Sequence, residues 1–115
     1  MRRADILPIH RTESDLPTDA AGRHTGNIID AAAGATRGFC LGVGYYDAAE
    51  FGKPGVHDDQ EAIYILEGTG TARVGGQEFP VAPGTAFYVA PGAPHTIRRD
   101  PGSGPVKVLW THGAI

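Results

Sequence analysis

At 115 residues, the chain is long enough for one domain with a single hydrophobic core. Its formal net charge of −3 and the lack of any basic run argue against a nucleic-acid partner. The single cysteine excludes an intrachain disulfide, and no apolar run approaches the ~20 residues that a membrane-spanning helix needs. No apolar segment of a signal peptide follows the basic start. We therefore expect a cytoplasmic protein that contacts neither nucleic acid nor membrane.

The chain contains 17 glycines and 9 prolines, which separate short apolar runs of the kind that form strands. Turn residues placed regularly between short strands are typical of a β-sandwich or a β-barrel. No helical periodicity is sustained along the chain. The sequence therefore predicts an all-β, antiparallel fold.

Residues 1–37 carry the weakest pattern and are predicted to form an N-terminal arm that belongs to the same domain as the rest. Short strands are expected at 6–9 and 27–30, with a polar loop from 11 to 24 between them. A single small barrel leaves sheet edges uncovered, so part of this arm is expected to pack against a second subunit. Residues 38–115 are predicted to form the β-barrel itself.

The barrel segment divides into strands that are separated by turns. Strands are expected at 39–46, 61–66, 71–74, 77–81, 85–89, 95–99 and 106–111. Gly75 and Gly76 are expected to form a two-residue hairpin turn of the type that needs a positive φ. In the first of these strands, Gly42 and Gly44 fall on one face, which suggests that another backbone approaches closely there.

Two histidines and a glutamate form the candidate functional site. Glu61 starts a strand and shares one face with Ile63 and Ile65, while His95 starts another strand. If both faces line one barrel, Glu61 and His95 converge in an apolar pocket, and His57, four residues before Glu61, joins them. Two imidazoles and a carboxylate on one side of a cation form a facial triad with open positions for water or substrate. The pattern therefore predicts one divalent transition metal ion.

The spacing of these residues resembles the two sequence motifs of the cupins. The matching residues are His57, Glu61 and Gly68 in the first motif, and Gly84, Gly92 and His95 in the second. The resemblance extends over residues 45–109 and indicates a small single-domain cupin. It implies a jelly-roll barrel (a double-stranded β-helix), a metal site and a homodimer.

Three motif positions carry other residues. Gly55 stands in place of the first histidine of the first motif, Ala90 in place of the proline of the second, and Arg99 in place of its asparagine. The missing histidine leaves three of the family's four metal ligands. Loss of one ligand affects both the affinity and the choice of metal, so iron, manganese, nickel and zinc all stay open.

The fourth coordination position has several candidates. Asp59, Cys40 or His112 could supply a protein ligand, or water could fill the place. In an alternative interpretation the site holds no metal, and the three motif residues are only buried hydrogen-bonding partners. A buried carboxylate without a cation or a donor is costly, which favours the metal.

Arg99 is the candidate substrate-binding residue. It has the same parity as His95 on its strand, which would point it inward, where a buried guanidinium needs an anion. We expect it to bind a carboxylate or phosphate of the substrate. No residue stands out as a separate general acid or base, and Tyr46 and Asp59 are the candidates for that role.

The resemblance to cupins implies dioxygenase, isomerase or lyase chemistry. We expect a metal-dependent enzyme that acts on a small polar metabolite. The alternative is a non-catalytic module that binds a sugar or an organic acid in the same pocket. Turnover of keto acids, sugars or thiols with added metal would separate these two functions.

Overall fold

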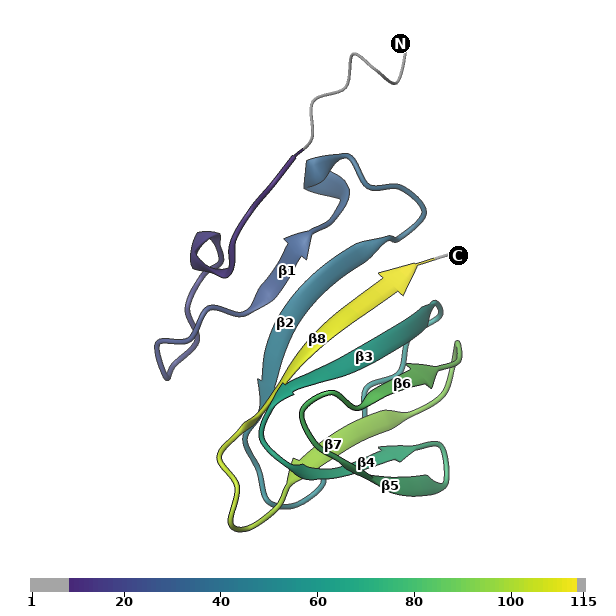
Figure 1. Cartoon of the computed structure of the whole chain (residues 1–115). Helices are drawn as coiled ribbons and strands as arrows, with labels where there is room; N and C mark the ends of the chain where they lie inside the picture. Colours follow the sequence, from purple (N-terminus) through teal and green to yellow (C-terminus); the bar gives the residue numbers. More distant parts are fainter. Residues whose placement is uncertain (1–8, 114–115) are drawn as a thin grey trace.

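The computed structural model describes residues 9–113 and consists of two antiparallel sheets that pack face to face (Figure 1). The larger sheet has five strands in the order β1-β2-β8-β3-β6, and the smaller sheet has three in the order β5-β4-β7. The strands are β1 (Gly26–Ile29), β2 (Cys40–Tyr46), β3 (Gln60–Glu67), β4 (Gly70–Val74), β5 (Gln77–Val81), β6 (Ala86–Val89), β7 (His95–Arg99) and β8 (Val106–Gly113). Two short 3₁₀ turns, η2 (Glu13–Asp15) and η3 (Ala31–Ala33), flank β1. The predicted all-β, antiparallel jelly-roll fold is confirmed.

The strands predicted from residue 39 onward are all present, with ends that differ from expectation by no more than two residues. The strand expected at 27–30 is present as β1, which pairs with β2, so the N-terminal arm contributes a strand to the larger sheet. The strand expected at 6–9 lies outside the described residues, apart from Ile9, which is not in a strand. Among residues 9–113, no helix is long and apolar enough to cross a membrane.

The core lies between the two sheets and results from the alternation of side chains along the strands. Ile63 and Ile65 of β3 and Val108 of β8 are at most 1% exposed. Burial of each such side chain stabilises the fold by roughly 1.5–3 kcal/mol. Glu61 and His112 share the parity of these residues and are paired in the register of β3 and β8. The core therefore holds both side chains on the inward face of the larger sheet.

A pair of glycines in β2 makes room for the indole ring of Trp110. A Cβ atom added at Gly42 or Gly44 would lie 2.6 Å from this ring. At Gly42 the carbonyl oxygen of Gly26 would be equally close, at 2.6 Å. The two glycines therefore do have a close neighbour, as expected. At both positions this neighbour is the Trp110 side chain of β8, and only at Gly42 is another backbone equally close. The Nε1–H of Trp110 donates to Oδ1 of Asn27 at 2.9 Å, which fixes the ring.

The segment between β2 and β3 runs along the edge of β7. The backbones of Gly55 and His95 exchange two hydrogen bonds of 2.9 and 3.0 Å, and the N–H of Arg99 donates to the carbonyl of Ala48 at 3.0 Å. These bonds cover an edge that β7 would otherwise expose. They also bring His57, two residues after Gly55, to the start of β7.

Two glycine turns agree with the sequence pattern. The hairpin predicted at Gly75 and Gly76 joins β4 to β5, and Gly75 has a φ of 59°. Gly68, the closing glycine of the first motif, has a φ of 83°, and a Cβ atom there would lie 2.5 Å from the carbonyl oxygen of Pro105. A residue with a side chain would be strained and would clash at this position.

Candidate metal centre

Four side chains from different parts of the chain meet at one end of the barrel. Glu61 lies near the start of β3, directly opposite His112 near the end of β8. His95 begins β7 in the smaller sheet, and the loop before β3 carries His57. Both sheets and one loop therefore contribute to the cluster.

The three imidazoles surround the carboxylate of Glu61. The Nε2 atoms of His57 and His95 lie 3.1 and 3.0 Å from Oε1 of Glu61. The Nε2 atom of His112 lies 3.0 Å from Oε2. The ligand atoms of His57, Glu61 and His95 all lie within 4.8 Å of one another, so a single cation could contact all of them.

One oxygen atom of the buried Glu61 carboxylate, Oε1, lacks a hydrogen-bond donor among residues 9–113. The side chains of Glu61 and His95 are only 5% and 7% exposed. Oε1 of Glu61 accepts no hydrogen bond from any of the described residues, although two imidazole nitrogens lie close to it. A buried oxygen in this state is costly unless a cation or a donor reaches it. The nitrogen and oxygen atoms of the cluster therefore fit a divalent transition metal.

The far side of each imidazole is held by an oxygen acceptor. Oδ1 of Asp59 lies 2.9 Å from Nδ1 of His57 and 3.2 Å from Nδ1 of His112. The carbonyl oxygen of Ala93 lies 3.1 Å from Nδ1 of His95. Because an ionised carboxylate and a carbonyl only accept, each Nδ1 carries a proton, and Nε2 is the ring nitrogen that faces Glu61 and is left to bind a cation.

Asp59 is kept ionised by the two histidines. Burial alone would raise the pKa of Asp59, but the hydrogen bonds and charges of His112 and His57 outweigh it and lower this pKa below its ordinary value of 3.8. The carboxylate is therefore an acceptor, and it is not available as a proton donor at neutral pH.

Among the candidates for the fourth ligand, His112 is the one whose nitrogen lies against Glu61. Asp59 lies close enough to His57 and His112 to form a second possible ligand group, on the Nδ1 side of both rings. Cys40 pairs with His112 in the register of β2 and β8, but burial raises the pKa of its thiol. Neither ligand group found among residues 9–113 includes Cys40.

Arg99 lies at the opposite end of β7 from His95. Its Nε–H donates to the carbonyl of Asp47 at 2.8 Å. Its Nη1 group lies 3.3–3.4 Å from the carbonyls of Asp100, Pro101 and Ser103. The guanidinium thus ties together two loops, and the structure does not bring it to the histidine cluster. Its role in binding a substrate anion stays a prediction.

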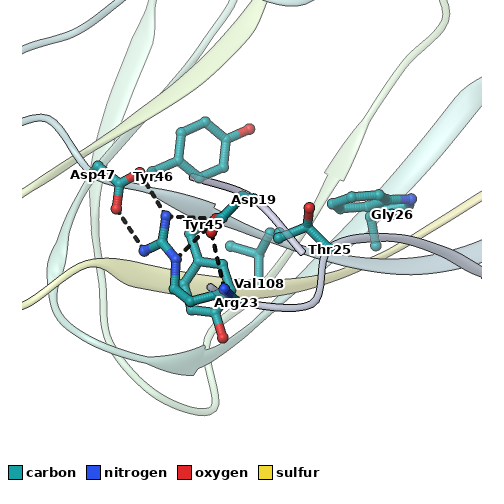
Figure 2. A pocket seen from close by; sticks show the side chains of 10 residues that line it. Asp19, Arg23, Thr25, Gly26, Tyr45, Tyr46, Asp47 and Val108 are labelled. Atoms are coloured by element: carbon teal, nitrogen blue, oxygen red, sulfur yellow. Dashed lines mark hydrogen bonds and ion pairs between the residues drawn. The ribbon is translucent and has the colours of Figure 1, made fainter. Parts of the chain in front are cut away.

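Two cavities lie near these elements. The one beside the cluster has a volume of about 310 Å³ and is lined by Phe39, Gln60, Glu61, Ala62, Tyr88, Thr111, His112 and Gly113. The other has a volume of about 400 Å³ and lies where the N-terminal arm meets the far end of β2 (Figure 2). Only the first cavity is in contact with members of the cluster.

The larger cavity is crossed by ion pairs, as Figure 2 shows. Arg23 lies 2.9 Å from a carboxylate oxygen of Asp19 and 2.7 Å from one of Asp47, and its guanidinium stacks 4.0 Å from the ring centroid of Tyr45. These contacts attach the arm to the sheet. Tyr46, a candidate acid or base, also lines this cavity, and burial together with the charge of Glu61 raises the pKa of its hydroxyl. Tyr46 therefore stays protonated at neutral pH.

Comparison with known proteins agrees with this architecture. The cupin domain family matches residues 45–112, which is more than half of the chain. The protein belongs to the cupin family. No curated protein matches the chain.

Solved structures of low sequence identity share the fold. The polyketide cyclase RemF from Streptomyces resistomycificus is 24% identical with a TM-score of 0.70, and the match covers 94% of this chain and 79% of RemF. The Schizosaccharomyces pombe Cnp3 cupin domain is 18% identical with a TM-score of 0.66, covering 79% of this chain and 60% of that one. The DMSP lyase DddQ from Ruegeria pomeroyi DSS-3 is 22% identical with a TM-score of 0.61, covering 70% and 40%. This chain therefore spans about three fifths of the Cnp3 chain and two fifths of DddQ.

The sequence leaves His112 as one of three protein candidates for the fourth ligand. His112 falls on the same face of the last strand as Val108 and Trp110, and this alternation places its side chain inward. That is the signal in the sequence that could have singled it out among the candidates for the fourth ligand. The sharing of Asp59 between His57 and His112 carries no comparable signal, since it depends on how two strands and a loop meet.

Proposed function

We propose that this cupin is a metal-dependent enzyme that acts on a small polar metabolite. His57, Glu61 and His95 would hold one divalent transition metal ion: iron, manganese, nickel or zinc. The observation that carries the proposal is the buried Oε1 atom of Glu61, which has no donor among the described residues and lies 3.0–3.1 Å from two imidazole nitrogens. A cation at this point supplies the positive charge that the carboxylate otherwise lacks.

The protein residues would prepare the site for chemistry in three ways. A bound metal would supply Lewis acidity toward a substrate oxygen. The acceptors Asp59 and Ala93 orient the imidazoles through Nδ1, which leaves each Nε2 as the nitrogen that would bind the metal. The apolar core below Glu61 excludes water, which strengthens every electrostatic interaction at the site.

The substrate is proposed to enter the cavity of about 310 Å³ beside Glu61 and His112. Its volume suits a small metabolite. Phe39 and Tyr88 supply apolar surface at this cavity, and the hydroxyl of Tyr88 donates to Gln60 at 2.9 Å. Dioxygenase, isomerase and lyase reactions are all compatible with one metal that holds the oxygen atoms of a substrate.

A non-catalytic binding module is the second candidate function. The observation that favours it is the lack of a free base among the cluster's described neighbours, since Asp59 is engaged by two histidines and the raised pKa of Tyr46 keeps its hydroxyl protonated. Such a module would bind a sugar or an organic acid beside the same cluster.

Turnover by metal-loaded protein separates the two functions. A panel of keto acids, sugars and thiols is incubated with protein loaded with each of the four metals. Product that forms with wild type and not with His95→Ala supports the enzyme. Ligand-induced thermal stabilisation without any product, across the whole panel, would support the binding module instead.

A homodimer is also part of this proposal, formed through the outer face of the larger sheet. Tyr64 on this face is 44% exposed, and it lines a small apolar hollow together with Leu41, Ala86 and Leu109. Antiparallel sheets that carry apolar side chains on both faces usually bury the second face as well. A second copy of the chain is the proposed partner, because an isologous contact covers the same face on both subunits.

A further inference from the structure

Gly55 lies beside the cluster, at the position where the first cupin motif has its first histidine. A Cβ atom added at Gly55 would lie 3.5 Å from both Cε1 and Nε2 of His95. Two backbone hydrogen bonds to His95 hold Gly55 in this place. A side chain at position 55 would therefore be directed toward the cluster, but glycine provides no ligand atom.

His112 reaches the same carboxylate from the other side of the barrel. Its Nε2 atom lies 3.0 Å from Oε2 of Glu61, and its ring centroid lies 4.4 Å from that of His57. It comes from β8, the last strand, and not from either motif. The cluster thus contains three histidines and one glutamate although a motif histidine is missing.

Asp59 is the structural link between His57 and His112. One oxygen atom, Oδ1, lies within hydrogen-bond distance of the Nδ1 atoms of both rings, at 2.9 and 3.2 Å. His95 is held separately, by the carbonyl of Ala93. A carboxylate that orients a ligating histidine from behind also fixes its tautomer and raises its basicity.

We propose that His112 is the fourth metal ligand, in place of the histidine that Gly55 replaces, and that Asp59 is the positioning residue that orients His57 and His112 together. This inference rests on the proposed metal-dependent function. A ligand from the loop before β3 is thereby exchanged for one from the last strand, while the set of three nitrogens and one carboxylate stays the same.

The first test needs no metal. Long-range ¹H–¹⁵N spectra of the metal-free protein report which ring nitrogen of each histidine carries the proton. Wild type should show protonated Nδ1 atoms for His57, His95 and His112. Asp59→Ala should move His57 and His112 away from this tautomer and leave His95 unchanged. Protonation of His112 on Nε2 in wild type, or no response of its tautomer to Asp59→Ala, would overturn the inference.

The second test transfers the ligand. Cobalt(II) affinity is measured by competition for wild type, His112→Ala, Asp59→Ala and the double variant Gly55→His/His112→Ala, with His24→Ala as a control. His24 bonds to the carbonyl of Leu16 in the N-terminal arm, away from the cluster. Asp59→Ala should weaken binding by about 10–100-fold, as loss of an outer partner usually does, and His112→Ala by at least as much.

The double variant gives the sharpest result. Histidine at position 55 should raise the cobalt affinity of the double variant at least tenfold above that of His112→Ala. It should also restore the intensity of the cobalt absorption bands. If the double variant does not fold, the cobalt affinity of His112→Ala, compared with that of the His24→Ala control, still decides whether His112 is a ligand. Unchanged cobalt affinity in His112→Ala would overturn this inference alone, whereas a wild type that binds no metal would overturn the proposed function as well.

Discussion

Glu61 and His112 face each other across the ladder of β3 and β8, with Nε2 of His112 3.0 Å from Oε2 of Glu61. The pair joins a motif residue to the last strand of the barrel. Its position at the end of a tightly packed core means that the carboxylate loses its hydration on folding and depends on its neighbours for compensation.

Glu61→Gln should have opposite effects with and without metal. The glutamine amide has almost the same shape and can donate to an imidazole nitrogen, so the metal-free variant should be more stable than wild type by about 1–3 kcal/mol. The same variant should lose the stabilisation that added metal gives. Urea denaturation with chelator and with zinc measures both effects. A metal-free variant less stable than wild type would show that Glu61 already has a partner.

Gly44→Ala should destabilise the fold because the added methyl group would lie 2.6 Å from the Trp110 ring. Such overpacking costs about 1–3 kcal/mol in the free energy of unfolding. Gly52→Ala is the matched control, since nothing lies within 4 Å of a Cβ atom there. Denaturation in the Trp110→Leu background provides the second control. A cost of Gly44→Ala that persists there would mean that the ring is not its cause.

Acid should weaken the attachment of the N-terminal arm. Hydrogen bonds from Arg23 hold the pKa of Asp47 below its ordinary value of 3.8. The ion pair therefore contributes its full stability above that value, and the contribution disappears as the pH falls through the lower pKa of the folded state. Thermal unfolding between about pH 5 and pH 2 should show a smaller loss of stability for Asp47→Asn than for wild type. Parallel pH profiles for the two proteins would contradict this account.

Tyr64→Lys should shift the protein from dimer to monomer, because a lysine on the outer face of the larger sheet opposes burial of that face. Light scattering across a dilution series measures the mass. Gln77→Lys, on the exposed edge strand β5, adds the same charge to the other sheet and should leave the dimer intact. A wild-type protein that is monomeric at all concentrations would contradict the proposed dimer interface.

The barrel could be predicted from the sequence because its signals are local. Short runs with period two and glycine turns placed the strands from residue 39 onward, and a positive φ at Gly68 explains why the first motif ends there. The approach of His57 and His95 to Glu61 also follows from residue parity within strands, once two strands are assigned to one barrel.

Features that depend on contacts between strands could not be predicted in this way. The glycines of β2 indicate a close neighbour but do not identify Trp110, which is set by the register with β8. Parity alone pointed Arg99 inward, yet its guanidinium is engaged by loop carbonyls that only the folded chain brings together. His112 and Asp59 meet for the same reason, through the pairing of distant segments.

Metal content tests the central claim most directly. Untagged wild-type protein, His57→Ala and His95→Ala are analysed for iron, manganese, nickel and zinc after reconstitution under reducing conditions. We predict about one equivalent of metal in wild type and its loss in both variants. Wild type that holds no metal after reconstitution, or variants that bind as much as wild type, would contradict a metal centre at Glu61.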